Sequence, residues 1–301
     1  MSIFFLKILV IYEKENLTYT KSEFGLLKIC NLAKQSKQHI SMPNIIYKNI
    51  PINYAFKGKG SAIVLLHGFL ENSSMWKGII LGLSKRNKVI TVDLFGHGKT
   101  ENLGYIHTME EQATMVRSVL KSLNIRKATL IGHSMGGYVA LAFAELFPKN
   151  TKGICLMNST AYPDTAEKKI NRNRAIEVAK QNHQTFVRLS IPLLFSEENQ
   201  TTLKEEVEAV TSEALKISKQ GIIASLEGMK IRKDRTAVLK NTDYKKLLIL
   251  GKKDTVLNFE EHQEQIKNTE TTLKILSQGH MSHIENNKEL TFALENFIKL
   301  Q

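Results

Sequence analysis

The stretch from Lys127 to Gly137 constrains the fold more than any other part of the sequence. A short apolar run ends at Gly132-His133-Ser134-Met135-Gly136, and a helical pattern of apolar residues follows from Tyr138 to Phe147. This order predicts a buried strand, a sharp turn with a serine at its tip, and a helix. Glycines at 132 and 136 suit a turn in which a larger side chain would collide with neighbouring backbone. The serine hydroxyl would lie above the sheet, at a helix N-terminus that favours developing negative charge.

Apolar runs and helical patterns alternate on both sides of this stretch. Two short strand candidates, 45–47 and 52–56, lead into runs at 62–66 and 88–92, and a further run follows at 152–157. Thr108 with Glu111 forms a capping box for a helix that runs to about Leu123. Such alternation is typical of a mainly parallel sheet with helices on both faces.

The alternation stops between residues 161 and 243. The segment contains helical patterns only, at 165–183, 184–189, 200–218 and 219–229. Strands are expected again at 246–250 and 272–276, with a helix near 260–268 between them and a last helix at 288–300. We therefore expect an α/β core formed by 42–160 and 244–301, with 161–243 inserted as a helical cap over the carboxyl ends of the strands. An extra helical layer without substrate contact is the alternative interpretation.

Residues 1–41 do not follow the pattern of the rest of the chain. An apolar run from Ile3 to Ile11 is broken only by Lys7 and is followed by a lysine-rich polar stretch. The run lacks a small-residue cleavage site and is too short for a membrane span. We expect an N-terminal appendage outside the core, and Met42 is an alternative start of the chain.

Three residue types needed for nucleophilic catalysis each follow a predicted strand. A serine hydroxyl needs a base, a group that orients the base, and donors for the oxyanion. Ser134 follows the central strand, Asp254 follows 246–250, and His280 follows 272–276. The backbone N–H groups of Met135 and Phe69 are the candidate oxyanion donors.

Five short motifs now support a resemblance to the α/β-hydrolase superfamily, in the branch of capped serine esterases, lactonases and carbon–carbon bond hydrolases. In chain order they are His67-Gly68-Phe69, Asp93-Leu94-Phe95-Gly96-His97-Gly98, Gly132-His133-Ser134-Met135-Gly136-Gly137, Gly251-Lys252-Lys253-Asp254 and Gly279-His280. The resemblance implies an eight-stranded, mostly parallel sheet with the cap inserted after the sixth strand. Dehalogenases and epoxide hydrolases carry an aspartate at the tip of the corresponding turn, so Ser134 argues against those branches.

Other polar residues compete for roles in the site. His283 is an alternative base to His280, and Asp164 is an alternative to Asp254 because some relatives place the acid after the sixth strand. We expect His133 to point into the core. We expect His67 and His97 to form hydrogen bonds within their loops, and Glu285 to cap the final helix. We expect a salt bridge between Arg232 and Asp234. Arg232 is also a candidate for binding a substrate carboxylate.

Composition narrows the class of protein. The 301 residues include two cysteines and carry a formal charge of +13. The basic residues are dispersed without interleaved aromatics, so we expect no nucleic-acid partner, and no apolar run is long enough for a membrane span. The distant cysteines favour a reducing, cytoplasmic location.

The sequence predicts a serine hydrolase of small-molecule esters that needs no cofactor or metal. A ligand receptor on the same fold, or a lyase or perhydrolase with the same triad, is the alternative, and the sequence leaves the oligomeric state open.

Overall fold

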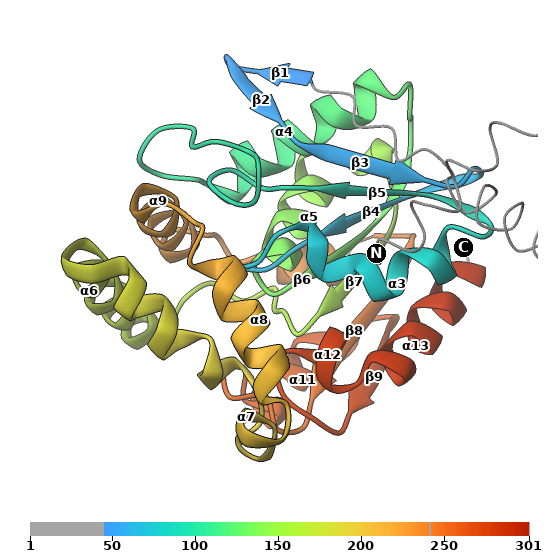
Figure 1. Cartoon of the computed structure of the whole chain (residues 1–301). Coiled ribbons are helices and arrows are strands. Elements are labelled where there is room, and N and C mark those ends of the chain that lie inside the picture. Colours follow the sequence, from blue (N-terminus) through green and yellow to red (C-terminus); the bar gives the residue numbers. More distant parts are fainter. Residues whose placement is uncertain (1–44, 241, 301) are drawn as a thin grey trace, which may run out of the picture. The chain divides into compact units, whose positions relative to one another are not determined.

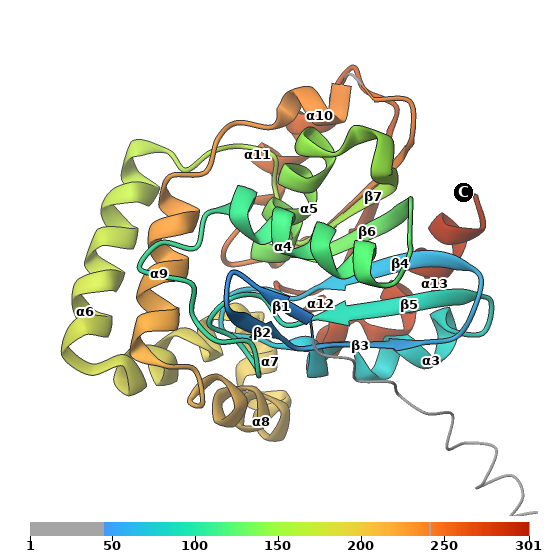
Figure 2. The ribbon, with the colours of Figure 1, turned by 90° about the horizontal axis from the view of Figure 1, so that it is seen from above.

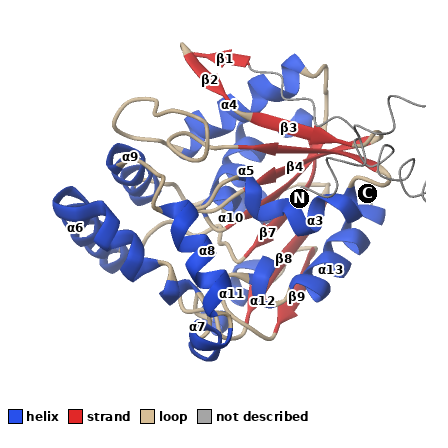
Figure 3. Cartoon of the chain, in the orientation of Figure 1, coloured by secondary structure: helices blue, strands red, loops and turns tan. Residues whose placement is uncertain are grey.

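A seven-stranded sheet forms the centre of the structure, a computed structural model that describes residues 45–240 and 242–300. The strands lie in the order β3-β5-β4-β6-β7-β8-β9, and β3 alone of these runs antiparallel to its neighbour, β5. Their bounds are Tyr54–Lys57 (β3), Ser61–Leu66 (β4), Asn87–Val92 (β5), Ala128–His133 (β6), Thr151–Met157 (β7), Lys245–Gly251 (β8) and Thr271–Leu276 (β9). Figures 1 and 3 show this sheet running through the molecule with helices on both faces. The expected appendage at 1–41 lies outside the described residues.

The expected count of eight strands in the central sheet is wrong for the described residues. Ile45–Tyr47 (β1) pairs with Ile50–Ile52 (β2) in a separate two-stranded sheet. Lys48 and Asn49 have φ values of 48° and 67°, as a two-residue hairpin turn of the primed type requires. Asn53 interrupts the predicted strand 52–56, because its backbone N–H donates to Thr100 Oγ1 and its side chain donates to Asp93. The first strands therefore leave the central sheet at Asn53.

The central strands are buried on both faces, and alternate residues enter different cores. In β4, Val64 and Leu66 pack in one cluster with helices α4 (Met109–Ser122) and α5 (Met135–Leu146). Ile63 and Leu65 point to the other face and pack with α3 (Lys77–Leu83) and α13 (Asn287–Lys299). This explains the continuous apolar runs of the sequence, since a strand covered by helices on both sides has no polar face.

A helical insertion joins β7 to β8. It contains α6 (Ala166–Ser190), α7 (Glu197–Thr202), α8 (Lys204–Ala214), α9 (Lys219–Lys230) and α10 (Thr236–Lys240). The predicted boundary between 165–183 and 184–189 corresponds to a kink inside α6, where Asn182 has non-helical dihedral angles. The predicted helix 200–218 is instead two helices, separated at Leu203.

The insertion contacts loops that follow several strands. The ring of Phe186 in α6 lies near the ring of Phe69, which belongs to the loop after β4. The two ring centroids are 6.4 Å apart. The backbone carbonyl of Leu194 accepts a hydrogen bond from the His280 N–H, in the loop after β9. Figure 2, seen from above, places α6 and α9 beyond one end of the strands. The helices therefore lie beside the carboxyl edge of the sheet.

Shorter helices complete the described chain. They are the 3-10 helices Ser73–Trp76, Pro148–Asn150, Pro192–Leu194 and Glu264–Ile266, together with α11 (Phe259–Gln263) and α12 (Ser282–Glu285). Within the described ranges, no helix combines the length and apolar character that crossing a membrane requires.

Candidate active site

Ser134 occupies the tip of a sharp turn between β6 and α5. Its backbone has φ 48° and ψ −114°, a conformation that residues other than glycine rarely adopt. An added Cβ on Gly132 would lie 2.2 Å from the Gly136 carbonyl oxygen, and one on Gly136 would lie 2.3 Å from that of Leu66. Both positions therefore require glycine. The Ser134 N–H donates to the Met157 carbonyl of β7, which ties the strained residue to the next strand.

Asp254 and His280 come from two further loops at the same edge of the sheet and form a buried pair. Nδ1 of His280 lies 2.8 Å from Asp254 Oδ2, and both side chains are almost completely shielded from solvent. Asp254 Oδ1 also accepts the backbone N–H groups of Val256 and Leu257. Burial alone would raise the pKa of Asp254, but His280 and these hydrogen bonds lower it below its usual value. An ionised Asp254 requires a proton on Nδ1, which leaves His280 Nε2 as a proton acceptor.

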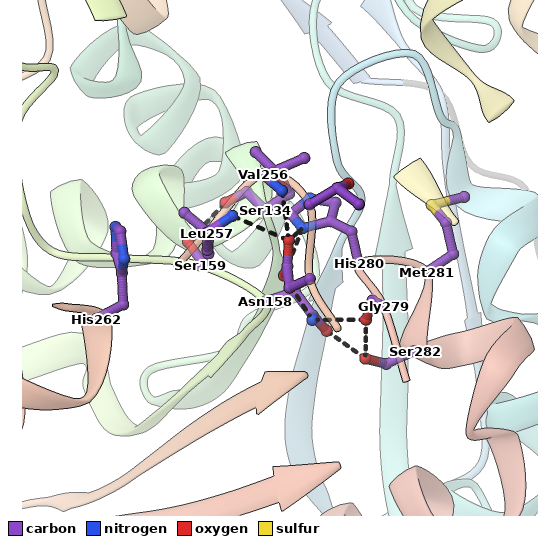
Figure 4. Close-up of polar contacts among 12 residues, drawn as sticks. Ser134, Asn158, Ser159, Val256, Leu257, His262, Gly279, His280, Met281 and Ser282 are labelled. Atoms are coloured by element: carbon purple, nitrogen blue, oxygen red, sulfur yellow. Dashed lines mark hydrogen bonds and ion pairs between the residues drawn. The ribbon is translucent and has the colours of Figure 1, made fainter. Parts of the chain in front are cut away.

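Asn158, which follows β7, connects this pair to the loop around His280. Its Nδ2 donates to Asp254 Oδ2 at 3.0 Å and to the Gly279 carbonyl at 3.2 Å, while its Oδ1 accepts from the Ser282 hydroxyl. Figure 4 shows Asn158 below Ser134, with dashed lines to Gly279 and Ser282, which both lie on its right. The sequence interpretation did not single out Asn158, although its place at the carboxyl end of a predicted strand was an available signal.

The two candidate oxyanion donors belong to segments that adjoin the serine. Met135 is the first residue of α5, where a helix leaves backbone N–H groups without partners inside the helix. Phe69 follows Gly68, and an added Cβ on Gly68 would lie 3.3 Å from Ser134 Cβ. The loop after β4 therefore runs directly against the serine, with the Phe69 ring near His97 and Phe186.

His67, His97 and His107 hold loops in place. The Nε2 atom of each accepts a backbone N–H, from Leu94, Leu70 and Leu103 respectively. Burial lowers the pKa of all three, to about 3 for His97 and to about 4 for His107. These histidines are neutral and structural, as the sequence predicts for His67 and His97.

The two alternative triad residues have other partners. Asp164 is buried and binds the guanidinium groups of Arg172 and Arg232, at 2.5 Å for Arg232 Nη1. The expected salt bridge between Arg232 and Asp234 is wrong, because Asp234 accepts hydrogen bonds from Thr236. The Nε2 atom of His283 lies 3.6 Å from Glu71 Oε1. The histidine beside Asp254 is His280.

Glu285 does not cap the final helix as expected. Its Oε1 accepts hydrogen bonds from the Ser196 N–H, the Ser196 hydroxyl and Asn199 Nδ2, and its Oε2 accepts from the Met281 N–H. Glu285 therefore joins the helical insertion to the loop that carries His280. Donors from both segments satisfy the oxygens of this half-buried carboxyl group.

One group of side chains has the composition of a metal site. Glu71, His133 and His283 are buried and offer ligand atoms within 4.8 Å of one another. However, Nδ1 of His133 already lies 2.7 Å from Glu71 Oε2, and Nε2 of His133 lies 2.9 Å from the His280 carbonyl. Because both ring nitrogens of His133 have protein partners, the arrangement fits an ion pair better than a set of metal ligands.

The strained serine turn, the paired aspartate and histidine, and the helical insertion beside them define an α/β protein with a hydrolase-like site. Residues 61–287 match the model of the α/β hydrolase fold family. The chain belongs to this family.

Individual relatives cover different parts of the chain. An uncharacterized protein of Mycobacterium tuberculosis is 36% identical over 106 residues, which are 35% of this chain and 31% of the relative. This chain thus matches about a third of that relative's length. A pimeloyl-[acyl-carrier protein] methyl ester esterase of Wigglesworthia glossinidia brevipalpis is 29% identical over 165 residues, 52% of this chain and 61% of the relative.

A solved structure matches over most of the chain. The thermophilic esterase of Thermogutta terrifontis superposes with a TM-score of 0.81 at 27% identity, covering 86% of this chain and 98% of the esterase. The similarity therefore includes the helical insertion as well as the sheet.

Proposed function

We propose that this protein is a serine hydrolase that cleaves an ester or related acyl bond of a small molecule. Ser134 is the nucleophile, His280 the general base and Asp254 the residue that orients the base. The observation that supports this most is the short contact of Asp254 with His280 Nδ1 at the same sheet edge as the strained Ser134 turn. The similarity to two proteins named as esterases supports the same reaction class.

The proposed reaction proceeds through an acyl-enzyme. Ser134 Oγ attacks the carbonyl carbon while its proton moves to His280 Nε2, and the imidazolium is stabilised by the Asp254 carboxylate. The N–H groups of Met135 and Phe69 bind the oxyanion of the tetrahedral intermediate. His280 then gives its proton to the leaving alcohol, and a water molecule, activated by the same histidine, releases the acid.

We further propose that the inserted helices form a cap that selects the substrate. The insertion touches the loops after β4 and β9, which carry Phe69 and His280. A cap at this edge of the sheet would restrict the acyl and alcohol groups that reach Ser134. A panel of chromogenic p-nitrophenyl esters with increasing acyl length tests both the activity and its chain-length preference.

The role of each residue is tested by three variants assayed with the best ester of that panel. Ser134→Ala should lower kcat by on the order of 10⁶, as expected for loss of a triad nucleophile. His280→Ala should be equally severe, whereas His283→Ala should retain activity within about tenfold. Ser134→Ala activity at a tenth of wild type would exclude the proposed nucleophile, and the reverse ranking of the two histidines would make His283 the base.

A burst of alcohol release separates this proposal from a receptor on the same fold. An enzyme that forms an acyl-enzyme releases one equivalent of chromophore quickly and then turns over. A receptor binds the ester but does not cleave it, so no chromophore is released.

A further inference from the structure

A buried ion pair lies behind the proposed site, and the reaction described above does not use it. Glu71 is 5% exposed and follows β4, while His133 is 1% exposed and immediately precedes Ser134. His283 lies against the same carboxylate at 3.6 Å. Burying such groups is costly unless they are paired, so the pair needs an explanation.

The hydrogen bonds of His133 require a proton on Nε2 and place Nδ1 against a carboxyl group. The His280 carbonyl can only accept, so the Nε2 atom of His133, 2.9 Å away, carries a proton. Nδ1 faces Glu71 Oε2 at 2.7 Å, and this oxygen also accepts the Gly68 N–H at 2.7 Å. An imidazolium opposite a carboxylate satisfies all three contacts together.

The electrostatic balance of the pair is consistent with this assignment. Burial alone would lower the pKa of His133, but Glu71 raises it above its ordinary value. Burial alone would raise the pKa of Glu71, but His133 and His283 lower it to about 2. The neighbouring His283 stays neutral because burial lowers its pKa to about 4. His67 and Asp254 are the other titratable groups that act on the pair, and His280 contacts the His133 ring at 5.1 Å between centroids.

The pair connects three segments that must be in register for the proposed reaction. Glu71 holds the N–H of Gly68, the residue before the oxyanion donor Phe69. His133 is the residue before Ser134 and holds the backbone carbonyl of His280. An added Cβ on Gly68 would lie 2.5 Å from Glu71 Oε2 and 2.8 Å from His133 Nδ1, so the segments are in direct contact.

We propose that Glu71 and His133 are positioning residues, whose ion pair holds the oxyanion loop and the main chain of His280 against the Ser134 turn. This inference rests on the proposed hydrolase function. Glutamine can place an amide oxygen where Oε2 lies, but it carries no negative charge and cannot replace Glu71 fully. An amide oxygen at that place would still accept from Gly68, but its lack of charge would no longer favour the imidazolium.

The ion pair is tested first without any substrate. Nuclear magnetic resonance of ¹⁵N-histidine-labelled protein at pH 8 should show one imidazole with both ring nitrogens protonated, and Glu71→Gln should remove that signal. A wild-type spectrum without such an imidazole would overturn the inference, whether or not the protein cleaves esters. One equivalent of zinc in the purified protein would also overturn it, because a metal on Nδ1 would replace the proton.

The positioning role is tested with the ester on which wild type is most active. Glu71→Gln should lower kcat by about 10- to 100-fold with KM changed less than threefold, because 1.4–2.7 kcal/mol of lost preorganisation corresponds to that range. The matched control is Asp164→Asn, which also converts a buried, ion-paired carboxylate to an amide but should keep kcat within threefold. Thermal unfolding of both variants verifies folding.

The outcomes of these experiments separate the inference from the proposed function. Wild-type kcat in folded Glu71→Gln would overturn the positioning role even if the doubly protonated imidazole is lost. If Glu71→Gln does not fold, His133→Gln serves instead, with the same expected loss of kcat and of the signal. Absence of ester cleavage in wild type contradicts the proposed function, and the resonance experiment still decides whether the pair exists.

Discussion

Acid should destabilise this protein strongly, because folding requires several histidines to remain neutral. His67, His97 and His107 each accept a backbone N–H on Nε2, and a protonated ring would oppose two donors at that contact. Burial lowers the pKa of His97 to about 3 and that of His107 to about 4, and it also lowers the pKa of His67. A lowered histidine pKa contributes stability that is present above about pH 6.5 and is lost as the pH falls toward the folded value.

The expected loss follows from the unfolded chain. At pH 5 an exposed imidazole with a pKa of about 6.5 is protonated, which favours unfolding by about 2 kcal/mol for each histidine kept neutral in the fold. His97 and His107, with pKa values of about 3 and about 4 in the fold, should together lower the free energy of unfolding by about 4 kcal/mol between pH 7.5 and pH 5, and His67 adds to this loss. His133 acts in the opposite direction, because Glu71 raises its pKa and its ion pair therefore adds stability as the pH falls. His262 and His283, whose pKa values burial also lowers, add to the loss.

Urea unfolding at pH 7.5, 6.0 and 5.0 measures this effect. Trp76 is the single tryptophan and is fully buried, so its fluorescence reports unfolding. We expect a fall of at least about 5 kcal/mol, a large part of a typical stability. In His107→Gln the amide oxygen can still accept the Leu103 N–H without titrating, so the fall should shrink by about 2 kcal/mol. A wild-type change below about 1 kcal/mol would refute the argument that these rings are buried and neutral.

Two further changes test the organisation of the chain. Asp164→Asn should destabilise the fold by about 3 kcal/mol, because it leaves the 5%-exposed Arg232 without its carboxylate. Differential scanning calorimetry would detect the lower Tm. Loss of ester cleavage by the folded variant would instead support Asp164 as the triad acid. A protein that begins at Met42 should keep full ester cleavage and a Tm within about 5 °C of the complete chain, because no proposed catalytic group precedes Phe69; a larger fall would show that residues 1–41 belong to the fold.

The sequence predicts the site best where a local pattern determines the structure. The Ser134 turn depends on an apolar strand, two glycines and a helix within one short stretch, and such patterns can be read without tertiary information. The order of alternating strands and helices similarly predicted a mostly parallel sheet with an inserted helical segment. The kink in α6 was also visible as a boundary between two helical patterns.

Contacts between distant segments could not be predicted in the same way. Asn158 meets Asp254 and Ser282, and Glu71 meets His133, only because the sheet brings their loops to one edge. The partner of Arg232 was missed because Asp164 is far away in sequence while Asp234 is near. The strand count failed because a single residue, Asn53, directs the chain out of the central sheet through its bonds to Asp93 and Thr100.

The position of the helical insertion has a consequence for how the chain folds. Strands β7 and β8 are direct neighbours, with Gly153 paired to Lys245, yet the whole insertion separates them in sequence. Their pairing must close a long loop before it gains any stabilisation, whereas the helices inside that loop form from local contacts. We therefore expect the β4 to β7 half of the sheet to assemble early and β8 and β9 to dock late. Asp254 and His280 would reach Ser134 only in that last step, so the appearance of ester cleavage during refolding should lag behind the recovery of helical signal.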